Sequence, residues 1–232
     1  MAVYIPEGYS PALGIYDTQN AIGFIKQRFE EVLTETLKLK RVSAPLFVGA
    51  DTGLNDDLNG IERPVVFEVS ALSQQAEVVH SLAKWKRMAL YKYQFHAGNG
   101  LYTDMNAIRR DEVLDNIHSI YVDQWDWERV ILESDRHLAY LETCVQSIVY
   151  GICSTLNALK AKYPQITTNL SSEVTFISAQ QLEDLYPDRT AKERETEFVR
   201  LHPTTFITQI GDTLTSGQKH DGRAPDYDDW SL

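Results

Sequence analysis

A polar face and an aromatic face alternate along the segment Ile117–Glu128, which reads IHSIYVDQWDWE. On a β-strand successive side chains point to opposite faces, so one amide and two carboxylates project together: Gln124, Asp126 and Glu128. The other face carries three aromatic residues that can pack in a core: Tyr121, Trp125 and Trp127. The polar face could be the floor of a binding site, or it could simply be wet.

Basic residues that could hold an anion occur in two blocks. Lys84, Lys86 and Arg87 lie in a predicted helix, where residues two apart point in different directions, so one or two of them can point inward. A solvated helix face is the alternative. Arg109 and Arg110 follow a predicted strand, and the planar guanidinium suits a phosphate because it donates two hydrogen bonds while staying charged.

Two polar loops carry clustered carboxylates, one at Ala50–Gly60 (ADTGLNDDLNG) and one at Gln218–Trp230 (QKHDGRAPDYDDW). The second loop contains a group of three: Asp226, Asp228 and Asp229. This group could form a surface turn, since Ala-Pro-Asp favours turns, or it could bind a metal ion or an amino group.

The histidines and cysteines do not indicate a metal centre. His80, His118 and His220 lack a metal-ligand spacing, so we interpret them as local hydrogen-bonding residues. Cys144 and Cys153 lie in one predicted helix with Cα atoms ~13 Å apart, too far for a disulfide within that helix. Both are expected to be buried, unreactive thiols.

The composition predicts a globular protein with one domain. The 232 residues are 43% hydrophobic, enough for a sizeable core. The net charge of −11 argues against a nucleic-acid-binding surface. No apolar run is long enough to span a membrane, and no secretory signal begins the chain, so a cytoplasmic location is expected.

Predicted helices alternate with predicted strands along the chain. Helices are expected at residues 18–40, 84–93, 134–163, 181–186 and 191–201. Strands are expected at residues 44–49, 65–70, 101–108, 119–130, 174–178 and 205–210.

Four blocks resemble the ammonia-dependent asparagine synthetase, the aspartate–ammonia ligase of the AsnA type: Glu77–Arg87, Gly100–Glu112, His118–Val130 and His220–Trp230. The resemblance runs from about Thr18 to the end of the chain. It implies an α+β fold in which an antiparallel sheet is flanked by helices, as in the catalytic core of class II aminoacyl-tRNA synthetases. It also implies one catalytic-type domain over residues 1–232, an N-terminal extension at residues 1–17, and a homodimer.

The resemblance implies a two-step reaction. The side-chain carboxylate of L-aspartate attacks the α-phosphorus of ATP, which gives β-aspartyl-AMP and pyrophosphate, and ammonia then displaces AMP to form L-asparagine. Mg²⁺ is the expected partner of the pyrophosphate oxygens, with its protein ligands unassigned. Because the chain has no G-x-x-x-x-G-K-[ST] sequence, ATP would not be held by a P-loop.

The resemblance also assigns roles to residues. The implied catalytic residues are Asp56, Lys86, Arg109 and Gln124. The implied substrate contacts are Ser81, Asp126, Arg223 and Asp228, and the implied nucleotide contacts are Arg109 and Glu112. Lys86 would meet the aspartate carboxylate, Arg109 the phosphate, and Asp56 would orient or deprotonate the incoming ammonium.

Members of this family continue beyond the DYDDW block with further strands and a glycine-rich segment whose arginine contacts ATP. We therefore expect the 232 residues to be a truncated synthetase with an incomplete ATP site. Two alternatives remain. One is a noncatalytic aspartate-binding or regulatory dimer module, and the other is the catalytic core of an aminoacyl-tRNA synthetase, which the acidic balance disfavours.

Overall fold

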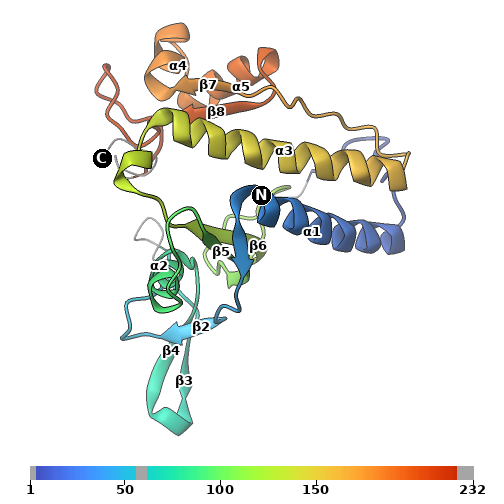
Figure 1. Ribbon diagram of the computed structural model, residues 1–232. Helices are drawn as coiled ribbons and strands as arrows, with labels where there is room; N and C mark the ends of the chain where they lie inside the picture. The colour runs from blue at the N-terminus through green and yellow to red at the C-terminus, as the bar shows by residue number, and fades with distance from the viewer. Residues whose placement is uncertain (1–3, 56–61, 224–232) are drawn as a thin grey trace. The chain divides into compact units, whose positions relative to one another are not determined.

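A computed structural model describes residues 4–55 and 62–223 of the chain (Figure 1). The chain divides into two units, the first formed by Met1–Ser10 with Lys38–Ile131 and the second by Pro11–Leu37 with Leu132–Leu232. No helix within the described ranges combines the length and the apolarity needed to cross a membrane.

A sheet of three strands, which we call the hairpin sheet, lies at the centre of the first unit. Its order is β1 (Leu39–Arg41), β5 (Gly100–Ile108) and β6 (Tyr121–Arg129). β1 runs parallel to β5, and β5 pairs antiparallel with β6 along its whole length, from Gly100 opposite Arg129 to Ile108 opposite Tyr121. The segment that connects β5 to β6 therefore begins at Arg109, directly after the last paired residue.

A second sheet and helix α2 also belong to the first unit (Figure 1). The antiparallel second sheet has the order β2 (Phe47–Gly49), β4 (Gln74–Val78) and β3 (Val66–Val69), and a short 3₁₀ turn connects β3 to β4. Helix α2 (Ala83–Lys92) follows β4 and packs against β5 and β6. The residues that join β4 to α2 thus lie beside the hairpin sheet.

The core of the first unit lies between α2 and one face of the hairpin sheet. Its buried residues come mainly from α2 and β5: Val48, Val79, Leu82, Trp85, Ala89, Leu90, Leu101, Met105 and Ala107. Paired residues of an antiparallel ladder share a face, so Gln124 lies beside Met105 and Asp126 beside Thr103 on this covered side. The polar face of β6 therefore points toward α2.

The hydrophobic core between α2 and the hairpin sheet lies on the polar side of β6 rather than on its aromatic side. Trp125 and Trp127 alternate with the residues on the covered side and are half-buried, while the side chain of Tyr121 is 59% exposed. The physical reason is that α2 brings Lys86 to the polar side, where its charge offsets the carboxylates and the stems of neighbouring side chains fill the core.

The second unit combines two long helices with a small α/β segment. Helices α1 (Ile15–Leu37) and α3 (Leu138–Lys162) lie alongside each other (Figure 1). The remaining elements are β7 (Thr175–Ser178), α4 (Ala179–Leu185), α5 (Ala191–Leu201) and β8 (Thr205–Thr208), with β7 parallel to β8. Ser178 and Thr190 cap α4 and α5, each through a capping box with the residue three positions later.

Several predicted boundaries differ from the observed ones. Helix α1 ends at Leu37 because Lys38 adopts a left-handed conformation with φ 55°, and the chain then enters β1, which the sequence pattern does not predict. The pattern also does not predict β4, although it is the central strand of its sheet. Among the described residues, two of the three sheets contain parallel pairs rather than antiparallel pairs alone. Of the two free cysteines, Cys144 is buried as expected and Cys153 is only half-buried.

Gly100 is expected to tolerate no side chain. A Cβ atom at this position would lie 2.3 Å from the Glu128 carbonyl oxygen and 2.9 Å from the Arg129 Cα atom, and backbone cannot move aside cheaply. Gly100→Ala should lower the free energy of unfolding by about 2–3 kcal/mol in urea denaturation. Gly23→Ala is the control, because a Cβ atom there meets nothing within 4 Å, and an unchanged stability of Gly100→Ala would contradict the strand pairing.

Candidate active site

Lys86 is the buried cation of the first unit's polar face. Its side chain is 3% exposed, and three oxygens lie within 3.4 Å of its Nζ atom. They belong to the carboxylates of Asp126 and Glu128 and to the carbonyl of Trp127, which accepts a hydrogen bond of 3.0 Å. A substrate carboxylate that binds Lys86 must therefore displace or share one of these partners.

Gln124 and Asp126 occupy adjacent places on the covered face of β6. The Gln124 amide contacts the Met105 sulfur at 3.5 Å, a weak hydrogen bond that a better partner can replace. Asp126 is 20% exposed, so one side of its carboxylate remains accessible beside Lys86. The sequence-predicted residues Lys86, Gln124 and Asp126 are thus brought together on one strand and the helix that covers it.

The segment between β4 and α2 is held by Asn55. The Asn55 side chain accepts a hydrogen bond of 2.9 Å from the His80 backbone N–H and donates one of 3.1 Å to Glu77. Next to His80, the Ser81 hydroxyl accepts a hydrogen bond of 3.1 Å from the Ala83 N–H, which forms a local turn just before α2. Ser81 is half-buried, and its placement beside the hairpin sheet keeps it a candidate substrate contact.

Arg109 and Glu112 lie in the connection after β5. Arg109 is 33% exposed, and its Nη1 atom is 3.9 Å from the Glu112 carboxylate, a distance that leaves the pair loose. The Arg109 backbone N–H donates to the Ile120 carbonyl at 2.8 Å, so the residue closes the hairpin. A fixed backbone with a loosely paired guanidinium suits an anion that arrives from solvent.

The same connection is tied to the preceding part of the unit by Arg63. The Arg63 Nε atom donates to Asp111 at 2.9 Å, and this hydrogen bond is the main cause that lowers the pKa of Asp111 to about 2. The folded-state pKa is below the ordinary value of 3.8, so the pair contributes stability above pH 3.8. That contribution is lost as the pH falls through about 2.

An NMR titration of the aspartate carboxyl carbons should show this shift directly. We expect Asp111 to titrate near pH 2, and Arg63→Gln should return its pKa toward 3.8. Asp115 is the internal control, because the backbone N–H of Ile117 and the ring of His118 lower its pKa to about 2 without Arg63. A midpoint near 3.8 for Asp111 in the unchanged chain would contradict the ion pair.

Three other predicted site residues cannot be joined to this cluster. Arg223 belongs to the second unit, where its side chain is 48% exposed and its Nε atom is 3.7 Å from Asp221. Asp56 and Asp228 lie outside the described residues. Asp56 follows Asn55 directly in the sequence, so the residue before it is anchored to the His80 backbone.

Two residues of this region are not assigned to the site by sequence patterns. The Glu128 carboxylate lies 3.4 Å from Lys86 and also forms an ion pair with Arg87. The alternation along β6 could have identified it, because Glu128 projects to the same face as Asp126. His80 has the sequence context of an ordinary hydrogen-bonding residue, yet no protein partner of its ring nitrogens lies within the part of the chain that the structure describes. The burial of His80 depends on tertiary packing, so the local sequence does not predict it.

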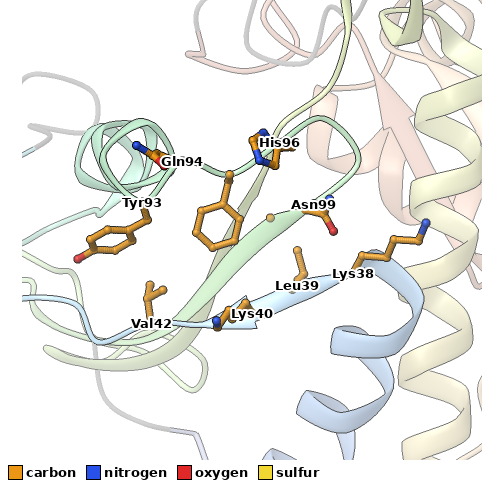
Figure 2. A pocket seen from close by; sticks show the side chains of 10 residues that line it. Lys38, Leu39, Lys40, Val42, Tyr93, Gln94, His96 and Asn99 are labelled. Carbon is orange, nitrogen blue, oxygen red and sulfur yellow. The ribbon is translucent and has the colours of Figure 1, made fainter.

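A larger cavity elsewhere in the first unit does not have the chemistry of a substrate site. It has a volume of about 620 Å³ and is lined by residues 38–40, 42, 93–96, 99 and 100. Figure 2 shows Lys38 and Lys40 directed to different sides of it, and both side chains are exposed. Without converging charges, this cavity offers no defined contact to an anion.

The described side chains do not form a metal centre of their own. Within residues 4–55 and 62–223, no three histidine, cysteine or acidic residues form a cluster that could hold an ion. Mg²⁺ is usually held by one or two carboxylates together with substrate phosphates, so it would belong with ATP rather than with a protein cage.

The chain matches known proteins along nearly its whole length. A family model described as aspartate–ammonia ligase matches residues 16–232. The aspartate–ammonia ligase of Clostridium perfringens is 55% identical over 231 residues, which is 99% of this chain and 69% of the relative. That of Ruminiclostridium cellulolyticum is 57% identical over 228 residues, 98% of this chain and 68% of the relative.

Solved structures show the fold. Asparaginyl-tRNA synthetase from Pyrococcus horikoshii, complexed with asparaginyl-adenylate, aligns with a TM-score of 0.58 at 15% identity over 82% of this chain. The Entamoeba histolytica enzyme aligns with a TM-score of 0.55 at 10% identity over 82% of this chain. The chain spans 45% and 43% of those structures, and small sheets flanked by helices follow the class II synthetase core. With the match over residues 16–232, the chain belongs to the aspartate–ammonia ligase family.

Proposed function

We propose that the protein takes part in the ATP-dependent ligation of ammonia to L-aspartate, which yields L-asparagine, AMP and pyrophosphate. The observation that carries the proposal is the family match over residues 16–232. The charges of the first unit support it, since one buried ammonium group, a polar strand face and an arginine in the β5–β6 connection suit a zwitterionic substrate and a nucleotide. The adenylate in the asparaginyl-tRNA synthetase structure belongs to the same class of acyl phosphate anhydrides.

In the first step, we assign the aspartate contacts to α2 and β6. Lys86 binds the α-carboxylate after exchanging one of its present oxygen partners, and Asp126 accepts hydrogen bonds from the α-amino group. Ser81 adds a hydroxyl at the start of α2. The low exposure of Lys86 strengthens the pairing, because charges attract more strongly where little water is present.

Arg109 serves the nucleotide in the same step. The β-carboxylate oxygen of aspartate forms a bond to the α-phosphorus, and the bond from that phosphorus to the bridging oxygen breaks as pyrophosphate leaves. The guanidinium stabilises the negative charge on the α-phosphate, and Glu112 meets the adenosine part. Activation is necessary because a carboxylate is a poor electrophile, whereas AMP is a good leaving group.

In the second step ammonia attacks the carbonyl carbon, and the carbon–oxygen bond to AMP breaks. We assign to Asp56 the orientation of ammonium and the acceptance of its proton, and to Gln124 a hydrogen bond to the reacting group. Arg223 and Asp228 complete the substrate contacts. The same proposal includes a homodimer, a cytoplasmic location, the use of MgATP and one catalytic-type domain over residues 1–232.

Incubation of the chain with aspartate, ATP and ammonium tests the proposal. Asparagine and AMP should appear in equal amounts, and pyrophosphate should be released only when aspartate is present. Aspartate binding without any AMP release would instead support a noncatalytic binding module. Aspartate-dependent charging of tRNA would favour an aminoacyl-tRNA synthetase, and a reaction without ammonium provides the control for each arm.

A further inference from the structure

A small polar cavity lies behind Arg109 in the first unit. Its volume is about 70 Å³, and its lining is charged or polar throughout: Glu62, Arg63, His80, Arg109, Arg110, Asp111 and Glu112. At ~30 Å³ for each water molecule, this space is enough for roughly two of them. Arg63 and Asp111 are hydrogen-bonded to each other, so this pair does not require a bound molecule in the cavity.

Three of the lining residues carry buried polar atoms that no described protein group satisfies. They are both ring nitrogens of His80, the Nε atom of Arg109 and one carboxylate oxygen of Glu62. The His80 residue is 1% exposed, so bulk water does not reach its ring. Buried polar groups are almost always hydrogen-bonded, and three such residues around one cavity indicate a common partner inside it.

The donors and acceptors around the cavity fit two water molecules. Arg109 Nε–H is a donor, the Glu62 oxygen is an acceptor, and a neutral imidazole supplies one donor and one acceptor. One water can accept from Arg109 and donate to the unprotonated nitrogen of His80. A second water can accept from the protonated nitrogen and donate to Glu62, which satisfies every buried atom.

We propose that two ordered waters occupy this cavity and that His80 is a positioning residue for Arg109. The His80 ring cannot follow a moving guanidinium, because Asn55 holds its backbone N–H at 2.9 Å and the neighbouring Val79 is 1% exposed. The water chain holds the guanidinium at Nε and leaves its Nη atoms free to turn toward an anion. The link to ATP rests on the proposed function, whereas the hydration of the cavity does not.

A high-resolution crystal structure of the unchanged chain tests the hydration. We expect density for two waters within hydrogen-bonding distance of the His80 nitrogens, Arg109 Nε and Glu62. A dry cavity, or His80 bonded directly to protein groups on both nitrogens, would overturn the proposal. This result does not depend on whether the chain turns over ATP.

The positioning role is tested by the hydrogen exchange of the Arg109 Nε–H group, measured by NMR. His80→Phe keeps the ring size and removes both nitrogens, so exchange should become about tenfold faster, equivalent to about 1.4 kcal/mol. His80→Gln restores a donor and an acceptor and should recover most of the protection. His96→Phe, at an exposed histidine of the same unit, is the control and should change nothing.

ATP binding then separates this role from a merely structural one. His80→Phe should weaken ATP affinity about tenfold while leaving aspartate affinity unchanged, since Lys86 lies on a different element. Equal exchange rates in His80→Phe and the unchanged chain would refute the positioning role. If the unchanged chain bound no ATP, the proposed function would be in error, while the exchange and crystallographic results would still decide the role of His80.

Discussion

Replacing Lys86 with methionine is expected to lower the free energy of unfolding by about 3 kcal/mol and to abolish aspartate binding. The substitution keeps the apolar stem but leaves Asp126 and Glu128 without the ammonium group between them. Breaking a buried ion pair typically costs about 3–5 kcal/mol, and the lower value applies because these carboxylates are 20% and 26% exposed. Urea denaturation and calorimetric titration with aspartate provide the two measurements.

Lys92→Met is the matched control, because Lys92 is an exposed residue in the last turn of the same helix. Its effect on unfolding should stay within about 0.5 kcal/mol. Lys86→Met combined with Asp126→Asn should recover part of the lost stability, since the carboxylate nearest to the lost ammonium group is neutralised while Glu128 keeps its contact with Arg87 at 3.4 Å. Wild-type stability in Lys86→Met would show that the ion pair is not formed in solution.

A loss of aspartate binding could also follow from a damaged fold, and Lys86→Arg distinguishes the two causes. The guanidinium keeps a positive charge beside Asp126 and Glu128, so the loss of stability should be smaller than in Lys86→Met. Its planar, wider head group cannot take the place of a compact ammonium group without moving its partners. A stable Lys86→Arg chain that binds aspartate normally would argue against a direct contact.

The chemistry of the first unit is predictable from the sequence where local periodicity determines it. Alternation along β6 is sufficient to place Gln124 and Asp126 on one face, and helical spacing indicates that Lys86 or one of its neighbours points inward. The choice between a wet and a buried polar face depends on α2, which lies far from β6 in sequence. Local pattern therefore determines which residues share the face but not whether the face is buried.

The features that the sequence pattern does not predict depend on contacts between residues that are distant in the sequence. β4 contains Gln74, Gln75 and Glu77, residues without a strong strand preference, and it forms because β2 and β3 pair with it on both sides. His80 is likewise a candidate functional residue only because it is buried beside Arg109, which is 29 positions later in the chain. Helix α5 is predicted with its observed bounds because Thr190 and Glu193 form a local capping box.

Arg109→Ala is expected to lower the rate of aspartate-dependent ATP–pyrophosphate exchange by about 10²–10³-fold, the usual loss when one pre-positioned donor to a developing charge is removed. The guanidinium has only a loose ion pair with Glu112 at 3.9 Å, so most of its interaction is available to the phosphate. Folding should be retained because the residue is one-third exposed and its backbone hydrogen bond to Ile120 remains.

Arg41→Ala is the control for this experiment, since it removes a guanidinium from the same sheet whose partner is Asp104 at 2.9 Å. Its exchange rate should stay close to that of the unchanged chain. Aspartate affinity should survive in Arg109→Ala, because Lys86 and Asp126 are untouched, so the defect should fall on the nucleotide step alone. If Arg109→Ala exchanged pyrophosphate at the normal rate, another cation would have to stabilise the α-phosphate. Arg223 of the second unit would then be the next residue to replace.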